Sequence, residues 1–193
     1  MDEDLPAEET VSSTNIYRGT ILHFKTTTVR LPSGRLHTRE IVEHPGAVAL
    51  IPVLGDTIVL IRQYRLAAGR TIYELPAGTL NTGEDPDICA AREITEETGY
   101  RARKLDKIFQ CYLAPGYSTE LMHFYVATEL EAGPQRLDED EEIQVYPTPI
   151  DEALAMVRRN EIMDAKTAVG LLLFDRLRKG LPSAEGGTEP VAD

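Results

Sequence analysis

The sequence predicts a mixed α/β domain, in which short strands form a sheet and helices cover it. Three observations lead to this prediction. Short apolar or alternating segments recur between residues 15 and 65, separated by turns rich in Pro, Gly and Asp. A segment with helical spacing follows, in which Ile88, Ala91 and Ile94 share one face. Asp151 and Asp164 then stand where helix N-caps are expected.

The elements follow in order along the chain. Residues 1–14 are acidic, polar and without periodicity, which predicts disorder. Turns at 32–34 and 55–56 each join two strands into a hairpin. Strands are expected at residues 17–22, 25–31, 36–42, 47–54, 57–65, 71–75, 106–113, 120–129 and 143–146. Helices are expected to begin at the two aspartate caps and to end near residues 159 and 179, before a disordered tail.

Composition limits the classes of function. The chain of 193 residues suits one domain of ordinary size. Its formal net charge of −12 would repel nucleic acid, although divalent cations would allow a small phosphorylated substrate to approach. No apolar run is long enough for a membrane span, and the acidic start does not resemble a signal peptide. The two cysteines lie in no redox or metal motif, so we expect a cytoplasmic protein.

One run of residues indicates a metal site. Gly78 is followed by Glu84 and then by a segment running from Arg92 to Gly99. If this segment is helical, its glutamates stand at i, i+3 and i+4 on one face, where like charges repel. Oxygen ligands of this kind bind hard divalent cations, whose charge reverses the penalty. The three glutamates are Glu93, Glu96 and Glu97.

The run resembles the Nudix box, G-x5-E-x7-R-E-U-x-E-E-x-G-U with U aliphatic. Every fixed position is filled, by Gly78, Glu84, Arg92, Glu93, Glu96, Glu97 and Gly99; Tyr100 at the last U departs from the pattern. The resemblance implies a Nudix fold, a mixed sheet sandwiched between helices, over residues 46–180. A small N-terminal β subdomain is expected at 15–45, with disordered segments at 1–14 and 181–193.

Further segments resemble the ADP-ribose pyrophosphatase group. Pro115 lies sixteen residues beyond Gly99, and the segments at residues 39–43, 62–65 and 74–78 look like those of the group. The resemblance implies metal-dependent hydrolysis of ADP-ribose to AMP and ribose 5-phosphate. Another nucleoside diphosphate sugar, such as ADP-glucose or GDP-mannose, is the alternative substrate. A nucleotide-sensing module without catalysis is a third hypothesis, which the complete set of box glutamates disfavours.

The resemblance also assigns roles at the metal site. Glu93 and Glu97 are the principal ligands of two or three Mg²⁺ ions, with Mn²⁺ as an alternative, and Glu96 shares or bridges. The backbone carbonyl of Ala77 is a further ligand. Glu84 and Arg92 are expected to form an ion pair that ties the loop to the helix. Gly78 is expected to lie beside the metal ligands without binding the metal itself. Arg92 and Glu96 are counted with the catalytic residues.

The remaining roles concern the general base, the substrate contacts and the assembly. An acidic loop supplies the general base, with Glu139 and Glu141 as candidates for base and added metal ligand; a solvated acidic loop is the alternative. Arg65 and Arg70 could hold phosphate or ribose, although surface arginines usually have no such role. Phe24 and Arg39 could stack on the adenine. Because the family commonly exchanges its β unit between subunits, the resemblance implies a homodimer.

Overall fold

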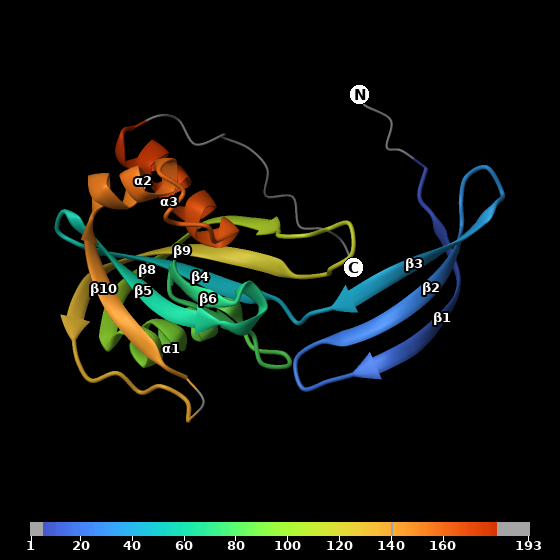
Figure 1. The fold of residues 1–193 in the computed structure, drawn as a ribbon, viewed down its shortest axis with the longest axis horizontal. Helices are drawn as coiled ribbons and strands as arrows, with labels where there is room; N and C mark the ends of the chain where they lie inside the picture. The colour runs from blue at the N-terminus through green and yellow to red at the C-terminus, as the bar shows by residue number, and fades with distance from the viewer. Residues whose placement is uncertain (1–5, 140, 181–193) are drawn as a thin grey trace.

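The computed structural model describes residues 6–139 and 141–180, and these form two β-sheets and three α-helices. The disordered tail predicted for residues 181–193 lies outside the described residues. A small antiparallel sheet in the order β1-β2-β3 projects from the body of the molecule (Figure 1). Its strands are β1 (Glu9–Arg18), β2 (His23–Arg30) and β3 (Leu36–Glu43).

Strand β1 begins earlier than the sequence predicts. Residues 9–14, expected to be disordered, pair with β2 from Glu9 opposite Arg30 onward. The segment contains Thr10, Val11 and Thr14, residue types that suit a strand. It shows no alternation because every residue of β1 is exposed. The expected strand at 17–22 is instead a strand end and a turn, closed by a 2.9 Å hydrogen bond from the Gly19 N–H to the Leu22 carbonyl.

The larger sheet carries seven strands. Its main path runs β10-β5-β4-β9-β8, with β6 paired to β5 and β7 paired to β4. Strands β4 and β9 run parallel, with Ala47 opposite Met122, whereas the other pairs are antiparallel. The strands are β4 (Ala47–Leu54), β5 (Thr57–Arg65), β6 (Arg70–Glu74), β7 (Ala77–Thr79), β8 (Tyr100–Tyr112), β9 (Leu121–Ala132) and β10 (Ile143–Pro149).

Helices cover both faces of this sheet. Helix α1 (Pro86–Thr98) lies on one face, and helices α2 (Ile150–Arg158) and α3 (Ala165–Arg178) lie on the other (Figure 1). A 3₁₀ turn, η1 (Leu66–Ala68), joins β5 to β6. Strand β4 is buried on both faces: Val48 and Leu50 pack in the cluster with α1, and Ile51 packs in the cluster with α2 and α3. The predicted mixed sheet between helices is confirmed.

Two helix starts differ in how well the sequence predicted them. Asp164 caps α3 as expected, its side chain accepting a 3.0 Å hydrogen bond from the Thr167 N–H. Helix α2 begins at Ile150 after Pro149, so Asp151 lies in the first turn rather than at the cap. There its negative charge still interacts favourably with the helix dipole. No helix within the described part of the chain is long and apolar enough to cross a membrane.

Candidate active site

Helix α1 carries the candidate metal ligands and packs on one face of the large sheet. Asp85 caps the helix by accepting a 2.8 Å hydrogen bond from the Asp87 N–H, and Pro86 occupies the first helical position. Gly99 ends the helix in the left-handed conformation, with φ of 72°. One face of the helix packs against the sheet through the buried side chains of Cys89, Ala90 and Ile94.

Two glutamates of α1 lie against the backbone that begins β7. Glu97, only 3% exposed, accepts a 2.8 Å hydrogen bond from the Ala77 N–H. Glu93 lies against Gly78, where a Cβ would stand 1.8 Å from the Glu93 carboxyl carbon. Only glycine therefore permits this approach. The structure thus brings Glu93, Glu97, Ala77 and Gly78 together.

Arg92 joins the box loop to the helix. Its Nε and Nη2 donate to the two oxygens of Glu84 at 3.2 and 3.1 Å. Hydrogen bonds from Arg92 and from the Asn81 backbone hold the pKa of Glu84 at about 2. Arg92 Nη1 also donates to Glu93 at 2.6 Å and to Glu96 at 3.0 Å. The arginine therefore contacts two of the three glutamates expected to bind metal.

The electrostatics of the glutamates favour a cation. Burial raises the pKa of Glu97 to about 8, and the charges of Glu93 and Glu141 act in the same direction. Burial also raises the pKa of Glu93, against the opposing effect of Arg92. Across residues 6–139 and 141–180, no three acidic, His or Cys side chains are already gathered for a metal. The deficit of positive charge and the oxygen-only donors nevertheless fit a hard divalent cation.

The acidic loop before β10 is tied to the end of α1. The Arg136 N–H donates to the Glu96 carbonyl at 3.0 Å, and Gln135 Nε2 donates to the Glu97 carbonyl at 2.5 Å. Glu141, half-buried on this loop, raises the pKa of both Glu93 and Glu97 through its negative charge. Glu139, on the same loop, is exposed. The charge of Glu141 therefore acts on both principal candidate metal ligands.

The two predicted phosphate-binding arginines differ in their surroundings. Arg65 ends β5 and forms a two-pronged ion pair with Glu74, at 2.7 and 2.9 Å. The hydrogen bond to Glu74 raises the Arg65 pKa, and the charge of Glu97 acts in the same direction. Arg70 pairs with Arg65 across the hairpin but is exposed, and its Nη1 contacts the Met163 sulfur at 3.4 Å.

The loop that contains Pro115 is fixed to the small sheet. Pro115 itself is exposed, and the loop closes with hydrogen bonds from Tyr117 and Ser118 to the Ala114 carbonyl. The end of β3 contacts the loop: the Val42 N–H donates to the Tyr117 carbonyl at 2.7 Å. The Pro115 loop is thereby linked to the strand that carries Arg39.

Phe24 and Arg39 of one small sheet are not placed to stack on the same adenine. Phe24 lies opposite Val42, whereas Arg39 lies opposite Thr27, in an unbroken β2–β3 register. Since successive side chains alternate, Phe24 and Arg39 point to opposite faces and are separated along the sheet by about 10 Å. Arg39 instead forms an ion pair with Glu8. The two residues thus cannot stack on the same ring from a single sheet.

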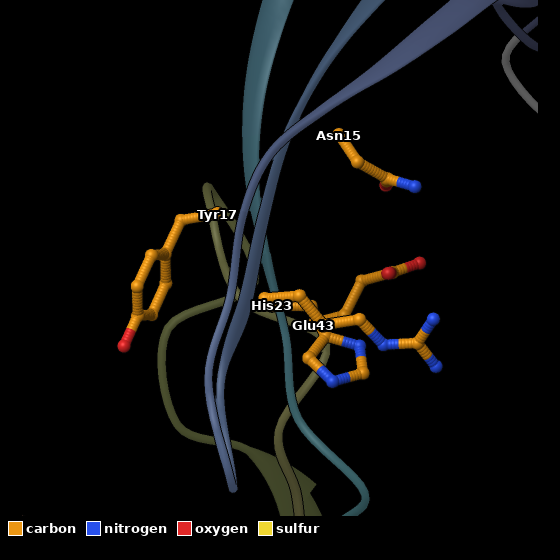
Figure 2. Close-up of a pocket in the computed structure, with 5 residues that line it drawn as sticks. Asn15, Tyr17, His23 and Glu43 are labelled. Carbon is orange, nitrogen blue, oxygen red and sulfur yellow. The ribbon is translucent and has the colours of Figure 1, made fainter.

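A small cavity of about 150 Å³ opens at the base of this sheet and is polar. Figure 2 shows Asn15, His23 and Glu43 on one side of the strands and Tyr17 pointing to the other side. Lys25 donates to Glu43 at 2.5 Å, so the cavity already contains a paired charge. It lies in the small sheet, not among the glutamates of α1.

The sequence did not indicate a buried charged cluster behind Arg65. Glu74 is 1% exposed and contacts both Arg65 and Lys166, and Lys166 is 8% exposed. Lys166 also contacts Asp164 at 3.0 Å. The aspartate was recognised only as a helix cap. Local periodicity gives no indication that a lysine two residues after a cap will be buried against a glutamate 92 positions earlier.

Comparison with known proteins identifies the family. A model of the NUDIX domain matches residues 43–168. The chain belongs to the Nudix family. It is 41% identical over 167 residues to the ADP-ribose pyrophosphatase of Bacillus subtilis (strain 168), covering 85% of this chain and 90% of that protein. The resemblance to the ADP-ribose pyrophosphatase group is confirmed.

More distant Nudix proteins show a wider range of named activities. A GDP-mannose pyrophosphatase of Escherichia coli O1:K1 / APEC is 37% identical over 146 residues, or 69% of this chain and 75% of that protein. A crystal structure described as an ADP compounds hydrolase superposes with a TM-score of 0.82 at 22% identity, covering 93% of this chain and 98% of that one. This last likeness confirms the Nudix fold.

Proposed function

We propose that this Nudix protein hydrolyses the diphosphate bond of ADP-ribose, giving AMP and ribose 5-phosphate. One observation carries the proposal: Glu93 and Glu97 are buried together against Ala77 and Gly78, and among residues 6–139 and 141–180 only Glu93 of the two has an ion pair, with Arg92. Such a site gains most from a divalent cation, and a diphosphate is the natural partner of that cation. The name and close similarity of the Bacillus subtilis relative support ADP-ribose as the substrate.

Each residue of the site would have a separate role in the hydrolysis. Water adds to one phosphorus while the bridging oxygen leaves with the other phosphate. Two or three Mg²⁺ ions, or Mn²⁺ in their place, would supply positive charge to the phosphates and acidify a bound water. Glu93, Glu97 and the Ala77 carbonyl would hold them, with Glu96 sharing. Arg92 orients Glu93 and Glu96 through its two hydrogen bonds.

A general base is needed outside the metal ligands. We propose Glu141 as this base or as an added metal ligand, because its charge already acts on Glu93 and Glu97. Glu139 would take the other role only if the loop moves, since it is exposed. Arg65 would hold a phosphate through the guanidinium edge that Glu74 does not occupy. Arg70 and the Pro115 loop would contact the terminal ribose.

GDP-mannose and ADP-glucose are the alternative substrates, and a specific observation favours the first. A relative that is 37% identical to this chain is named a GDP-mannose pyrophosphatase. Both present the same diphosphate to the glutamates as ADP-ribose does; ADP-glucose differs from ADP-ribose in the sugar, and GDP-mannose differs in the nucleobase and the sugar. A sensor without catalysis is disfavoured because Glu93, Glu96 and Glu97 are all present.

We further propose a cytoplasmic homodimer in which the small sheet reaches a second copy. Strand β1 is exposed along its whole length, and Ile16, Tyr17 and Leu36 are each more than half exposed. The sheet projects from the body (Figure 1), as an element that covers a partner would. Arg39 would then contact the substrate held by the other copy, and Phe24, on the opposite face of the sheet, would contact the substrate held by its own copy.

Chromatographic product analysis tests the proposed activity. The purified protein is incubated with ADP-ribose, ADP-glucose or GDP-mannose, each with and without Mg²⁺. Release of AMP mainly from ADP-ribose, and only with the metal, is the expected result. Preferential cleavage of another sugar nucleotide would keep the reaction and replace the substrate. No metal-dependent cleavage of any of the three would contradict the proposal.

A further inference from the structure

Four charged side chains form a closed cluster behind the candidate diphosphate site. Glu74, at the end of β6, forms a bidentate ion pair with Arg65, accepting hydrogen bonds from its Nε at 2.7 Å and its Nη2 at 2.9 Å. The same carboxylate contacts Lys166 Nζ, which also donates to Asp164 at 3.0 Å. Two cations therefore balance two anions across β5, β6 and the start of α3.

The cluster is more deeply buried than a surface ion pair. Glu74 is 1% exposed and Lys166 is 8% exposed, whereas the Arg65 side chain is 44% exposed. Charges in such a position are costly to desolvate, and apolar side chains of the same volume would often stabilise the fold at least as well. Packing alone is therefore a poor reason for Glu74 and Lys166 to be charged.

The cluster is also attached to the segment that meets the metal ligands. Glu74 is three residues before Ala77, whose N–H donates to Glu97. Between them, the Leu75 N–H donates to Thr167 Oγ1 at 2.7 Å, and that hydroxyl donates to Asp164 at 2.5 Å. The start of α3 thus holds both the Glu74 carboxylate and the backbone leading to the site.

This cluster determines the orientation of the Arg65 guanidinium. Glu74 occupies Nε and Nη2 of Arg65, and Nη1 has no hydrogen bond to any residue between 6 and 139 or between 141 and 180. An unpaired arginine side chain samples many rotamers, but a two-pronged pair fixes the plane of the guanidinium. The side chain is 44% exposed, so its Nη1 edge remains accessible beside the segment that leads from Glu74 to Ala77 and its contact with Glu97.

We propose that Glu74 and Lys166 are positioning residues, which together hold Arg65 so that its Nη1 edge binds the diphosphate of the substrate. Lys166 is needed because it holds the same Glu74 oxygen that Arg65 Nη2 contacts, and it neutralises Asp164 beside it. The inference rests on the proposed function, since it assumes a diphosphate at Glu93 and Glu97. It predicts that Glu74 and Lys166 act on substrate binding only through Arg65.

A double-mutant cycle tests this dependence. Steady-state kinetics with ADP-ribose and Mg²⁺ are compared for Arg65→Met, Glu74→Gln and the double variant. Each single change is expected to raise KM about tenfold with a smaller effect on kcat, as for loss of a charge-assisted contact to bound substrate. The double variant should have the KM of Arg65→Met alone. Multiplying effects on KM would contradict the proposal.

Variants of the lysine extend the test. Lys166→Met should raise KM, and Lys166→Arg should restore it, since arginine keeps the charge. Glu131→Gln removes the partner of the exposed Arg103 and serves as the matched control, with KM unchanged. If Glu74→Gln does not fold, the same cycle is run with Lys166→Met. A lowered melting temperature with KM unchanged in every folded variant would show a purely structural role.

The proposed function and this inference fail in different ways. A wild-type protein that cleaves no nucleoside diphosphate sugar removes both. A wild-type protein that releases AMP, together with variants whose KM for ADP-ribose stays at the wild-type value, overturns only the positioning role.

Discussion

Gly78 sets how closely a carboxylate can approach the backbone at the candidate site. With any larger residue, the Glu93 carboxyl group would be displaced from the start of β7, since a Cβ would stand 1.8 Å from its carbon. Glu97 is held there by the Ala77 N–H. The Glu93 and Glu97 side chains are therefore already ordered before a cation binds, which reduces the conformational entropy lost on binding the cation.

Glu97→Gln should separate catalysis from folding. Turnover of ADP-ribose should fall about 100-fold or more, because a neutral amide is a poor ligand for a hard cation. Without divalent cation, the variant should melt at or above the wild-type temperature, since burial already disfavours the Glu97 charge. Added Mg²⁺ should raise the melting temperature of the wild type more than that of the variant. Near-normal turnover would refute the metal assignment.

Glu84 should contribute a pH-dependent part of the stability. Its folded-state pKa of about 2 is below the ordinary value of 4.5, so the Arg92 pair stabilises the fold above pH 4.5 and loses this effect as the pH falls toward 2. Glu84→Gln should therefore lower the free energy of unfolding at pH 6 by roughly 1 kcal/mol. The difference from wild type should shrink in urea titrations between pH 4.5 and pH 2. A constant difference would contradict this.

At this scale, the sequence predicted what depends on spacing and missed what depends on distant contacts. Helical spacing alone places Glu93, Glu96 and Glu97 on one face. The contact of Arg92 with Glu96 is also an i,i+4 pair, so spacing could have indicated it. The Glu74–Lys166 pair joins residues 92 positions apart, and such a tertiary pair leaves no local pattern.

Elements were predicted best where both ends carry distinct residues. The β4–β5 hairpin has Leu54 opposite Thr57, as the two-residue Gly55-Asp56 turn requires. Strand β1 was missed before residue 15 because an exposed strand has no burial alternation to reveal it. The acidic loop before β10 was predicted as irregular, but its hydrogen bonds to the end of α1 were not, since Gln135 and Arg136 reach carbonyls across the fold.

We expect substitutions of Glu141 and Glu139, the two candidate bases on the acidic loop, to have different effects on kcat. Glu141→Gln should lower kcat for ADP-ribose about 100-fold, because Glu141 is the loop carboxylate whose charge reaches Glu93 and Glu97. Glu139→Gln, the matched control on the same loop, should stay within a few-fold of wild type. The measurement is steady-state kinetics at saturating Mg²⁺. Equal losses would show that the loop moves to bring Glu139 in, and full rates in both would refute a base on this loop.

At the scale of the whole molecule, the small sheet is the part that we propose a second copy covers. It is joined to the body mainly where β3 meets the Pro115 loop and continues into β4. The large sheet is covered by helices on both faces, whereas β1 is exposed throughout. A second copy that covers the small sheet would also bring Arg39 to a site whose glutamates belong to the other chain.

Mixing two inactive variants tests this shared site. Arg39→Ala removes a contact made by the small sheet, and Glu97→Gln removes a ligand from the body. If sites are shared, a mixed dimer contains one site with both residues intact, so random re-association should restore about a quarter of wild-type activity. Mixing Glu93→Gln with Glu97→Gln, which damage the same body, should restore none. An active Arg39→Ala protein, or a stable monomer by sedimentation at micromolar concentration, would show that each copy completes its own site.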